Sequence, residues 1–368
     1  MSPLAQLLRG VRAVVVAAGL AVGTLACGQG RPSSVGAVDQ GLLAAFDSGV
    51  WCIQETRDGA LWFGTNGGGV VRYDGERLTR FTDEDGLAGD SLRGLVEDAQ
   101  GRLLLSTTSG VSLFAEGSFR TLEIHDLAAG EGWTLRDDDL WFAFAPGTGG
   151  PCRWDGETLT RLVLPESPAE ADWKARYPGS SFPGSGVYTV TRDRSGHVWI
   201  GTASVGLGRF DGRAFAWLAR EDLTTTPSGG AFGIRSIHED RRGSFWINNT
   251  RQRFEVAPTT RTEDGFVLLD VRESAGLPEA SAPEDRNFSF YSSMAEDERG
   301  ALWFACGADG VWRHDGDSVT RFPVGEDAYV LVVFLDREGR LWAGTLEDGV
   351  HVLEGGSFRP LRTTGLAK

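Results

Sequence analysis

The chain alternates short apolar runs with polar turns, and one such phrase returns seven times. In its clearest copy a turn ending in Asp-Gly leads into the apolar residues 60–63, and the small pair Gly64-Thr65 follows. A second apolar run then closes on Arg72-Tyr73-Asp74-Gly75. Runs of four or five residues rich in Trp, Phe, Val and Ile, bounded by Gly and Asp, are typical of β-strands. The pattern therefore predicts an all-β chain with many short strands.

The copies recur at roughly 40 to 60 residues, which is the length of one blade of a β-propeller. Four strands can be assigned to each copy, and tight turns between them favour antiparallel pairing. We therefore predict one seven-bladed β-propeller of four-stranded antiparallel blades over residues 42–368. Either residues 42–46 or residues 357–363 are expected to supply the outer strand that closes the last blade. Aligned on the first turn, the copies lie at Gly59, Gly101, Asp138, Gly196, Gly243, Gly300 and Gly339.

Most of the repeated residues are expected to serve the scaffold. Asp precedes the turn Gly by three positions in five copies, and an Asp that opens a turn closed by Gly needs no metal to explain it. A Trp occupies one strand position in six copies, which predicts a packing layer between neighbouring blades. The turn residues are Asp98, Asp193, Asp240, Asp297 and Asp336, and the Trp residues are Trp62, Trp141, Trp199, Trp246, Trp303 and Trp342.

The N-terminus has a different pattern from the repeats. Residues 1–26 carry Arg9 and Arg12 before a short apolar stretch, which predicts a secretory signal peptide. The sequence Gly-Thr-Leu-Ala before Cys27 resembles a bacterial lipobox, which implies that Cys27 is lipidated; ordinary signal-peptide cleavage nearby is the alternative. Residues 27–41 are rich in Gly, Ser and Pro, so a flexible tether is expected between the anchor and the propeller. The expected location is the periplasm or the cell surface, on the outer membrane.

Charge and cysteine content narrow the expected partners. The formal net charge of −15 disfavours nucleic acid, and the membrane is expected to be reached only through the lipid anchor. Beyond Cys27 there are three Cys in non-adjacent copies, which favours buried free thiols over disulfides. No cofactor motif, phosphate loop or metal-ligand spacing is present, so neither a cofactor nor a metal is expected.

The phrase Asp-x-x-Gly-x-Leu-Trp-x-Gly-Thr, followed by Gly-Gly-Val-x-Arg-Tyr-Asp, resembles the two-component regulator propeller repeat. The linker around Gly86-Leu87 is similar to the phrase that joins those repeats. Copies three and five depart from it, with Phe142-Ala143-Phe144 and Asn248-Asn249 in place of Gly-Thr. The resemblance implies a periplasmic sensor propeller, here without the membrane span and kinase that follow it in hybrid sensor kinases.

Streptogramin lyases repeat a similar Gly-x-Leu-Trp-Phe phrase, so an enzyme is the alternative. Their next strand resembles Asn-x-Ile-Gly-Arg-Ile, whereas this chain has Gly-Val-Val-Arg-Tyr-Asp there. His238, beside Glu239 on an inner strand, is the one candidate general base. No Ser-His-Asp order is present, and the sequence predicts no catalytic residues.

A ligand site is expected where the repeat stops being regular. The two widest intervals come from long loops, roughly residues 165–186 and 273–288, on the face where the inner strands begin. Residue type varies at these strand starts, and aromatic and Arg side chains suit stacking on rings and pairing with carboxylate or sulfate. A rim without a ligand is the alternative. The candidate ligand-binding residues are Trp51, Arg93, Trp133, Tyr188, Arg235 and Tyr291, with Leu331 in the last blade.

The sequence thus favours a non-catalytic, exported binding or sensor-like propeller. Its expected partner is a small-molecule or saccharide ligand, or a membrane signalling protein. A lyase centred on His238 and a protein-docking scaffold are the two alternatives.

Overall fold

The structure is a computed structural model, and its chain divides into residues 1–37 and 38–368. It describes residues 46, 48–129, 131–143, 150–180, 184–224, 233–250, 252–256, 260–261, 263, 267–277, 291–326, 328–362 and 366–367. The predicted signal peptide, Cys27 and the tether lie outside these residues. Within the described ranges, no helix is long and apolar enough to cross a membrane.

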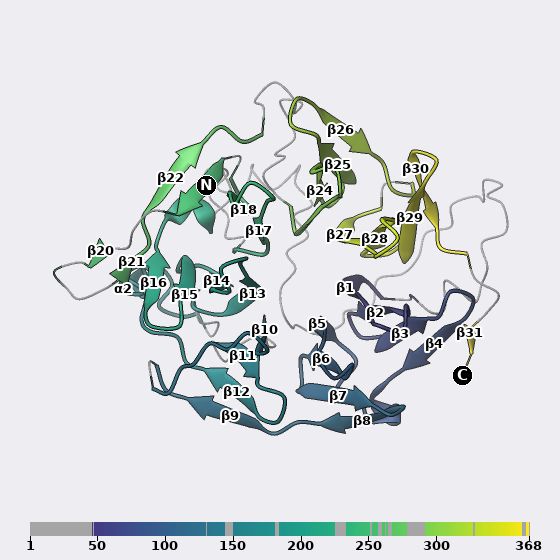
Figure 1. Cartoon of the computed structure of the whole chain (residues 1–368), viewed down its shortest axis with the longest axis horizontal. Coiled ribbons are helices and arrows are strands. Elements are labelled where there is room, and N and C mark those ends of the chain that lie inside the picture. Colours follow the sequence, from purple (N-terminus) through teal and green to yellow (C-terminus); the bar gives the residue numbers. More distant parts are fainter. Residues whose placement is uncertain are drawn as a thin grey trace, which may run out of the picture. The chain divides into compact units, whose positions relative to one another are not determined.

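The second unit is a seven-bladed β-propeller, which confirms the predicted fold (Figure 1). Four blades have the expected order of four antiparallel strands, from the innermost to the outermost. Neighbouring innermost strands contact each other around the whole ring, including the last blade against the first. Blade one contains β1 (Val50–Glu55), β2 (Leu61–Thr65), β3 (Val70–Tyr73) and β4 (Leu78–Phe81), and blade two contains β5 (Leu92–Glu97), β6 (Leu103–Thr107), β7 (Val111–Ala115) and β8 (Ser118–Thr121). Blade six contains β23 (Ser293–Glu296), β24 (Leu302–Ala305), β25 (Val311–His314) and β26 (Val319–Phe322), and blade seven contains β27 (Val330–Leu335), β28 (Leu341–Thr345), β29 (Val350–Glu354) and β30 (Ser357–Pro360).

Blade three departs from the repeat, and the prediction of an inner strand there is wrong. Its innermost strand is the Trp strand, and its fourth strand lies at the outer edge, paired in parallel with the strand beside it. The chain therefore enters this blade from the outside. From the centre outward the strands are β10 (Leu140–Ala143), β11 (Pro151–Trp154), β12 (Leu159–Leu162) and β9 (Ile124–Leu127).

Blades four and five share a strand insertion that the sequence analysis missed. A hairpin inserted within blade five pairs with the outer strand of blade four, so blade four becomes a six-stranded sheet. The wide interval after Gly243 thus comes partly from this hairpin, and most of the expected loop of residues 273–288 lies outside the described residues. Blade four contains β13 (Val187–Arg192), β14 (Val198–Thr202), β15 (Leu207–Phe210) and β16 (Phe215–Leu218), extended by β21 (Val267–Leu268) and β20 (Thr260–Arg261). Blade five contains β17 (Ile237–Glu239), β18 (Phe245–Ile247), β19 (Arg253–Val256) and β22 (Val271–Ser274).

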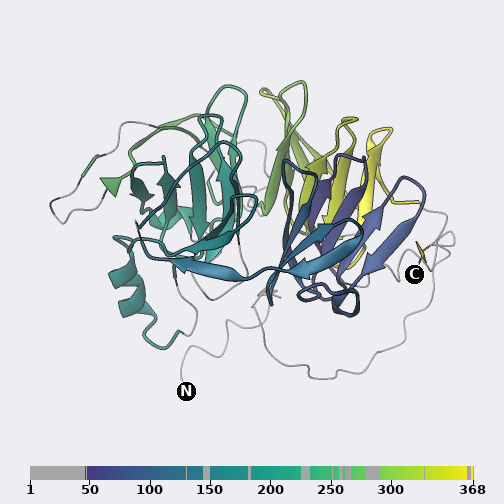
Figure 2. The ribbon, with the colours of Figure 1, turned by 60° about the horizontal axis from the view of Figure 1, so that its bottom comes forward.

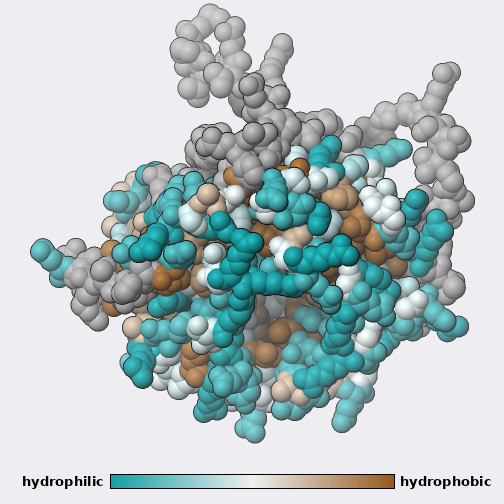
Figure 3. Space-filling model, turned by 45° about the horizontal axis from the view of Figure 1, so that its top comes forward, coloured by the Kyte–Doolittle hydropathy of each residue, from teal (hydrophilic) through white to brown (hydrophobic). Residues whose placement is uncertain are grey.

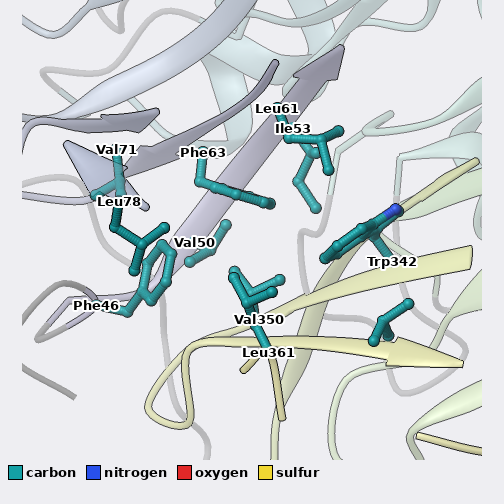
Figure 4. Close-up of a cluster of buried hydrophobic side chains, with 11 residues drawn as sticks. Phe46, Val50, Ile53, Leu61, Phe63, Val71, Leu78, Trp342, Val350 and Leu361 are labelled. Atoms are coloured by element: carbon teal, nitrogen blue, oxygen red, sulfur yellow. The ribbon is translucent and has the colours of Figure 1, made fainter. Parts of the chain in front are cut away.

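Within the described part of the chain, the hydrophobic core forms seven clusters, each shared by two neighbouring blades. The cluster between blades seven and one packs Trp342 against Phe63 with ring centroids 6.1 Å apart (Figure 4). Every repeated Trp belongs to one of these clusters, and Leu104 replaces it in blade two. The predicted Trp packing layer is confirmed, because each blade buries its faces against its neighbours.

The first-turn Asp residues have a second role besides opening the turn. In blade five, Asp240 Oδ1 accepts the backbone N–H groups of Arg242 and Ser244 at 2.9 and 3.0 Å. Its Oδ2 accepts the indole N–H of Trp246 at 2.9 Å. The turn interpretation is confirmed, and four of the five Asp residues also fix the orientation of the Trp ring six residues later, whereas Asp98 accepts the indole N–H of Trp154. The same indole bond joins Asp193 to Trp199, Asp297 to Trp303, and Asp336 to Trp342.

A repeated clasp joins the first turns of neighbouring blades. The donor is an Arg in the first turn of a blade. Its backbone N–H donates to the side chain of a Glu that ends the inner strand of the neighbouring blade, and its guanidinium donates to a backbone carbonyl in or beside the first turn of that neighbouring blade. Because both bonds cross the blade junction, they fix the angle between blades. The pairs are Arg57 with Glu97, Arg194 with Glu239, Arg241 with Glu296, and Arg337 with Glu55.

The C-terminal segment supplies the outer strand of blade seven, as one of the two expected alternatives. The chain then continues to β31 (Leu366–Ala367), which pairs in parallel with β4 of blade one. At the other end of the described chain, Phe46 packs edge-on against Phe63 with ring centroids 5.5 Å apart. Both ends of the described propeller therefore contact the first blade.

Two end faces result from this arrangement. The helix α2 (Glu170–Arg176) lies in the long connection before β13, below the strands in Figure 2 and on the face where the inner strands begin. Two short 3-10 turns, η2 (Asp83–Asp85) and η3 (Glu221–Leu223), lie in equivalent connections before β5 and β17. Figure 3 shows hydrophilic side chains surrounding a central hollow with hydrophobic residues deeper inside.

Candidate functional site

Four of the inner strands begin with a β-bulge at the end of the central channel. In β1 the register shifts between Val50 and Cys52, so Trp51 is the residue without a ladder partner. The same shift leaves an extra residue in β5, β13 and β27. A bulge residue is released from the ladder and its side chain is redirected. The bulge residues are Trp51, Arg93, Tyr188 and Leu331.

The register of blades five and six places two further residues at this level. In blade five Ile237 pairs with Ile247, just as Ile53 pairs with Phe63 in blade one. Arg235 lies two residues before Ile237 and Trp51 lies two residues before Ile53, so Arg235 is equivalent to Trp51. Ser293 faces Ala305 as Cys52 faces Gly64, so the equivalent residue in blade six is Ser292. We name the set of six the mouth ring: Trp51, Arg93, Tyr188, Arg235, Ser292 and Leu331.

The assignment of Tyr291 to the channel mouth is wrong by one residue. Its side chain is fully buried, with its ring centroid 4.9 Å from that of Phe304. It occupies the core position that Val50 and Val330 fill in their blades, and burial raises the pKa of its hydroxyl well above the usual range. An aromatic residue at a core position is indistinguishable by type from an aromatic at the mouth, so sequence alone favoured the wrong residue.

The assignment of Trp133 to the start of an inner strand is also wrong. Its segment connects β9 at the outer edge of blade three to β10 at the centre. Its ring packs edge-on against Phe210 and Phe215 of blade four, with centroids 5.2 and 5.7 Å away. The indole N–H donates to the carbonyl of Ala128 at 3.1 Å. The residue covers the core between blades three and four, because blade three lacks the expected inner strand.

Trp51 and Arg93 form one contact pair of the mouth ring. The Arg93 guanidinium lies 4.7 Å from the centre of the Trp51 ring and donates to its own neighbour, the carbonyl of Leu92, at 2.8 Å. Burial lowers the pKa of Arg93. Among the described residues, the buried indole N–H of Trp51 has no acceptor, and Arg93 forms no ion pair. The pair therefore offers an unused donor beside a positive charge.

Tyr188 and Arg235 form a second pair between blades four and five. The Arg235 guanidinium lies 4.5 Å from the centre of the Tyr188 ring. Burial lowers the pKa of Arg235, while Tyr188 and Tyr329 act in the opposite direction. Tyr329, which directly precedes β27, is thus a third member that the sequence analysis missed. Its only sequence signal is its place before the first core residue of blade seven, Val330.

The irregular Asn248-Asn249 of copy five supports this second pair. Asn248 Oδ1 accepts the backbone N–H of Arg235 at 2.9 Å, which replaces a ladder bond before β17 begins. Asn249 has a positive φ of 72° and donates to the carbonyls of Leu223 and Gly233 at 2.6 and 3.0 Å. The departure from Gly-Thr therefore holds the backbone of Arg235 at the mouth.

His238 lies elsewhere on the same inner segment as Arg235. Three residues of extended chain separate them by about 10 Å along the channel. The His238 Nε2 atom is 3.5 Å from Glu296 Oε2, and burial lowers the pKa of the imidazole. Glu296 also accepts the backbone N–H of Arg241 at 3.0 Å as part of a blade clasp. The structure therefore does not bring His238 together with the mouth ring.

The remaining reactive side chains are dispersed. Cys152 and Cys306 are buried free thiols, as predicted, whereas Cys52 is half-buried. Burial raises the pKa of both Cys52 and Cys152 to about 12, so these thiols are poor nucleophiles. Within the described part of the chain, no group of three His, Cys, Asp or Glu side chains is arranged to hold a metal ion.

Comparison with known proteins supports the repeat assignment. The two-component regulator propeller model matches residues 46–67 and 181–204, which include the mouth-ring residues Trp51 and Tyr188. No curated protein matches the chain.

Solved structures share the fold at low identity. The extracellular domain of a putative hybrid two component system from B. thetaiotaomicron is 18% identical with a TM-score of 0.55, covering 84% of this chain and 38% of that one. This chain thus spans less than half the length of that protein. A catalytically inactive virginiamycin B lyase from Staphylococcus aureus with quinupristin is 14% identical with a TM-score of 0.55, covering 83% and 94%. A streptogramin B lyase structure is 14% identical with a TM-score of 0.52, covering 83% and 92%.

Both kinds of neighbour share the propeller fold, and the repeat model matches two of the seven blades. The resemblance expected from the Trp-Gly-Thr phrase is thereby confirmed. The chain is a seven-bladed propeller, and two of its segments match the two-component regulator propeller repeat.

Proposed function

We propose that the chain is an exported, non-catalytic binding propeller whose mouth ring takes an anionic, ring-containing ligand such as an acidic saccharide. The observation that carries the proposal is the pair of Trp51 and Arg93. A guanidinium stacked on an indole presents a positive charge and a flat apolar surface side by side. Sugars carrying carboxylate or sulfate groups match both.

The unused indole N–H of Trp51 strengthens the argument. A buried donor without an acceptor costs about 1–3 kcal/mol, so a ligand oxygen that accepts this hydrogen bond recovers that free energy. The varying residue types of the mouth ring also contrast with the constant turn Asp and packing Trp. A site that varies on a repeated scaffold is where a propeller acquires specificity.

The expected location follows from the N-terminal pattern and from the neighbours. The sequence pattern predicts a signal peptide at residues 1–26 and a lipidated Cys27, followed by a flexible tether over residues 27–41. The hybrid two component system neighbour is described as an extracellular domain. We therefore place the propeller outside the cytoplasm on a lipid anchor, where a bound ligand can be passed or reported to a membrane signalling protein.

The test is a calorimetric screen of the purified chain against neutral, uronate and sulfated oligosaccharides. An acidic saccharide is expected to bind, and Arg93→Gln is expected to weaken it at least tenfold, since a charge-assisted contact contributes about 1.5–3 kcal/mol. The matched control is Arg120→Gln, which removes an exposed Arg from the outer strand of the same blade. Equal loss in both variants, or binding of neutral sugars only, contradicts the proposal. Binding of a protein and of no saccharide supports the docking scaffold.

The lyase alternative rests on the contact of His238 with Glu296. We expect His238→Ala to leave saccharide binding at the mouth unchanged, because the two sites are about 10 Å apart along the channel. Turnover of a cyclic ester or uronate substrate that disappears in His238→Ala establishes the enzyme instead.

A further inference from the structure

A cavity of about 480 Å³ lies between blades one and two, and it is separate from the mouth ring. Its volume is in the range of sites that bind small molecules. Its lining includes Arg57, which follows the inner strand β1, whereas Trp51 lies at the start of that strand. Six residues of extended chain separate the two by about 20 Å. The cavity therefore belongs to the face of the first turns, opposite the mouth.

Three aromatic rings line this cavity, Trp62 and Phe81 from blade one and Phe114 from blade two. The Phe81 ring lies nearly parallel to Trp62, with centroids 5.8 Å apart and an interplanar angle of 19°. The Phe114 ring lies 5.0 Å from Trp62 and 5.9 Å from Phe81. Trp62 is buried, whereas Phe81 and Phe114 are half-buried and so retain accessible ring surface. Such a wall favours an aromatic ring as the occupant.

The size of Leu103, which also lines the cavity, leaves space for such a ring. The equivalent residue of blade five is Phe245, because it pairs with Phe254 as Leu103 pairs with Phe114. The ring centroid of Phe245 lies 4.4 Å from that of Trp199, the repeated Trp of blade four. A phenyl ring thus packs against the repeated Trp at that junction. At the junction of blades one and two, the smaller Leu103 leaves this place to a ligand.

Two arginines and two carboxylates complete the lining. Both oxygens of Glu97 accept the backbone N–H of Arg57, and both oxygens of Asp58 accept protein donors, one of them Arg72 at 2.9 Å. Each guanidinium has five N–H donors, and the described structure pairs one from Arg72 and one from Arg57, the latter with the carbonyl of Ala99. The remaining hydrogen-bonding capacity is therefore mainly that of cationic donors, which matches a carboxylate.

We propose that this cavity binds a small aromatic carboxylate. The ring lies against Phe81 and Phe114, and the carboxylate accepts hydrogen bonds from Arg57 and Arg72. This site is additional to the saccharide site proposed at the mouth and does not depend on it. Because the ligand contacts both blades and binds only the folded chain, it should also raise the melting temperature.

The experiment titrates the purified chain by calorimetry with phenylacetate, phenylethanol and phenethylamine, which share one carbon skeleton. Phenylacetate is expected to bind at least about tenfold more tightly than the alcohol, because its hydrogen bonds to arginine are charge-assisted. The amine should bind more weakly than the acid. Arg72→Gln should reduce the affinity for phenylacetate to that for the alcohol. Leu103→Phe should weaken both by at least about tenfold, because the larger side chain occupies the cavity.

Arg313→Gln is the matched control. Arg313 stacks on Trp303 in blade six at 5.6 Å, as Arg72 stacks on Trp62 at 6.0 Å. This variant should bind phenylacetate as the wild-type chain does. Arg93→Gln tests the mouth ring, which also combines an arginine with an aromatic ring. Loss of phenylacetate binding in Arg93→Gln, with binding retained in Arg72→Gln, places the ligand at the mouth and overturns the proposal.

If Leu103→Phe does not fold, Arg57→Gln takes its place. Arg57 is exposed, and its bond to Glu97 comes from the backbone N–H, so the variant keeps that part of the clasp. It should lower the affinity for phenylacetate toward that for phenylethanol and leave the alcohol unaffected. Equal affinities of the wild-type chain for the three compounds, or no binding of phenylacetate, overturn the proposal. Neither result bears on saccharide binding at the mouth, which is measured separately.

Discussion

The backbone N–H of Arg337 donates to Glu55 Oε2 at 2.8 Å and so joins the seventh blade to the first across 282 residues of sequence. The Arg337 side chain adds a bond of 3.0 Å from Nη1 to the carbonyl of Thr56. This junction has no connecting loop, because its two blades lie at opposite ends of the propeller sequence. The same clasp occurs inside the chain between Arg57 and Glu97.

Removing the clasp at either junction should therefore lower the free energy of unfolding by a similar amount. Glu55→Ala and Glu97→Ala should each lower the free energy of unfolding by about 1 kcal/mol, since the bonds are charge-assisted but partly exposed. Urea unfolding followed by Trp fluorescence measures the change. Glu55→Ala should in addition increase hydrogen exchange in β1 and β27, because only non-covalent contacts close that junction. Unchanged unfolding free energies in both variants contradict the clasp.

The buried Asp336 should be the costlier turn residue to lose. Its carboxylate accepts N–H groups of Glu338, Arg340 and Trp342, so Asp336→Ala leaves buried donors unpaired and should cost about 2–4 kcal/mol. Asp336→Asn keeps one acceptor oxygen and should be milder. The control is Asp74→Ala in an exposed second turn, where the loss should be clearly smaller. Equal losses at Asp336 and Asp74 are incompatible with the Trp-fixing role.

Tyr291 should behave as a core residue without a role in binding. In the described structure its buried hydroxyl has no hydrogen-bond partner. Tyr291→Phe should therefore leave the free energy of unfolding unchanged or raise it above that of the wild-type chain. Tyr291→Ala should cost about 3–5 kcal/mol through the cavity it leaves. Thermal unfolding and saccharide binding are measured for each variant. If Tyr291→Phe loses saccharide binding while remaining folded, the register assignment at the mouth is wrong.

His314 should make the fold sensitive to moderate acid. It occupies the strand position of Tyr73 in blade one, and its ring centroid lies 5.9 Å from that of Trp246. Burial lowers the pKa of the imidazole below its usual value, so the unfolded chain takes up a proton that the folded chain rejects. Stability should therefore fall as the pH drops below about 6.5, and this loss is complete below the folded-state pKa.

His314→Phe should reduce that loss while preserving the ring contact. The measurement compares unfolding free energies at pH 7.5 and 5.5 in both proteins. His238 and His351, whose pKa values burial also lowers, retain their own contributions in the variant. The same decrease in wild type and variant rules out a contribution from His314.

The fold was predictable because its repeated residues act locally or between sequence neighbours. Asp240 and Trp246 are six residues apart, and their hydrogen bond lies inside one hairpin. The strand order of blade three could not be predicted. Its innermost strand, which begins at Leu140, follows a segment that runs from the outer edge to the centre, and no periodicity in the sequence signals that change of direction. The hairpin of β20 and β21 was missed for a similar reason, since it joins the sheet of another blade.

The candidate site was predictable in residue type more than in position. Trp51, Arg93 and Tyr188 lie at the start of inner strands as expected, and Arg235 lies two residues before one, because the apolar pattern of each strand is regular enough to set its start. Tyr291 was misplaced because it fills the buried core position one residue before the mouth, and its residue type does not separate the two positions. Tyr329 was missed because its proximity to Arg235 depends on the closure of the ring.

The bulge at the start of four inner strands has a consequence for protein engineering. A residue outside the ladder can be exchanged without breaking a strand pair, and the core residue beside it keeps the blade in register. The six positions of the mouth ring therefore form a set at which a library can be built on an unchanged propeller, with six of the seven blades each contributing one position to vary. Selection from such a library would change what the opening holds and leave the blade junctions intact.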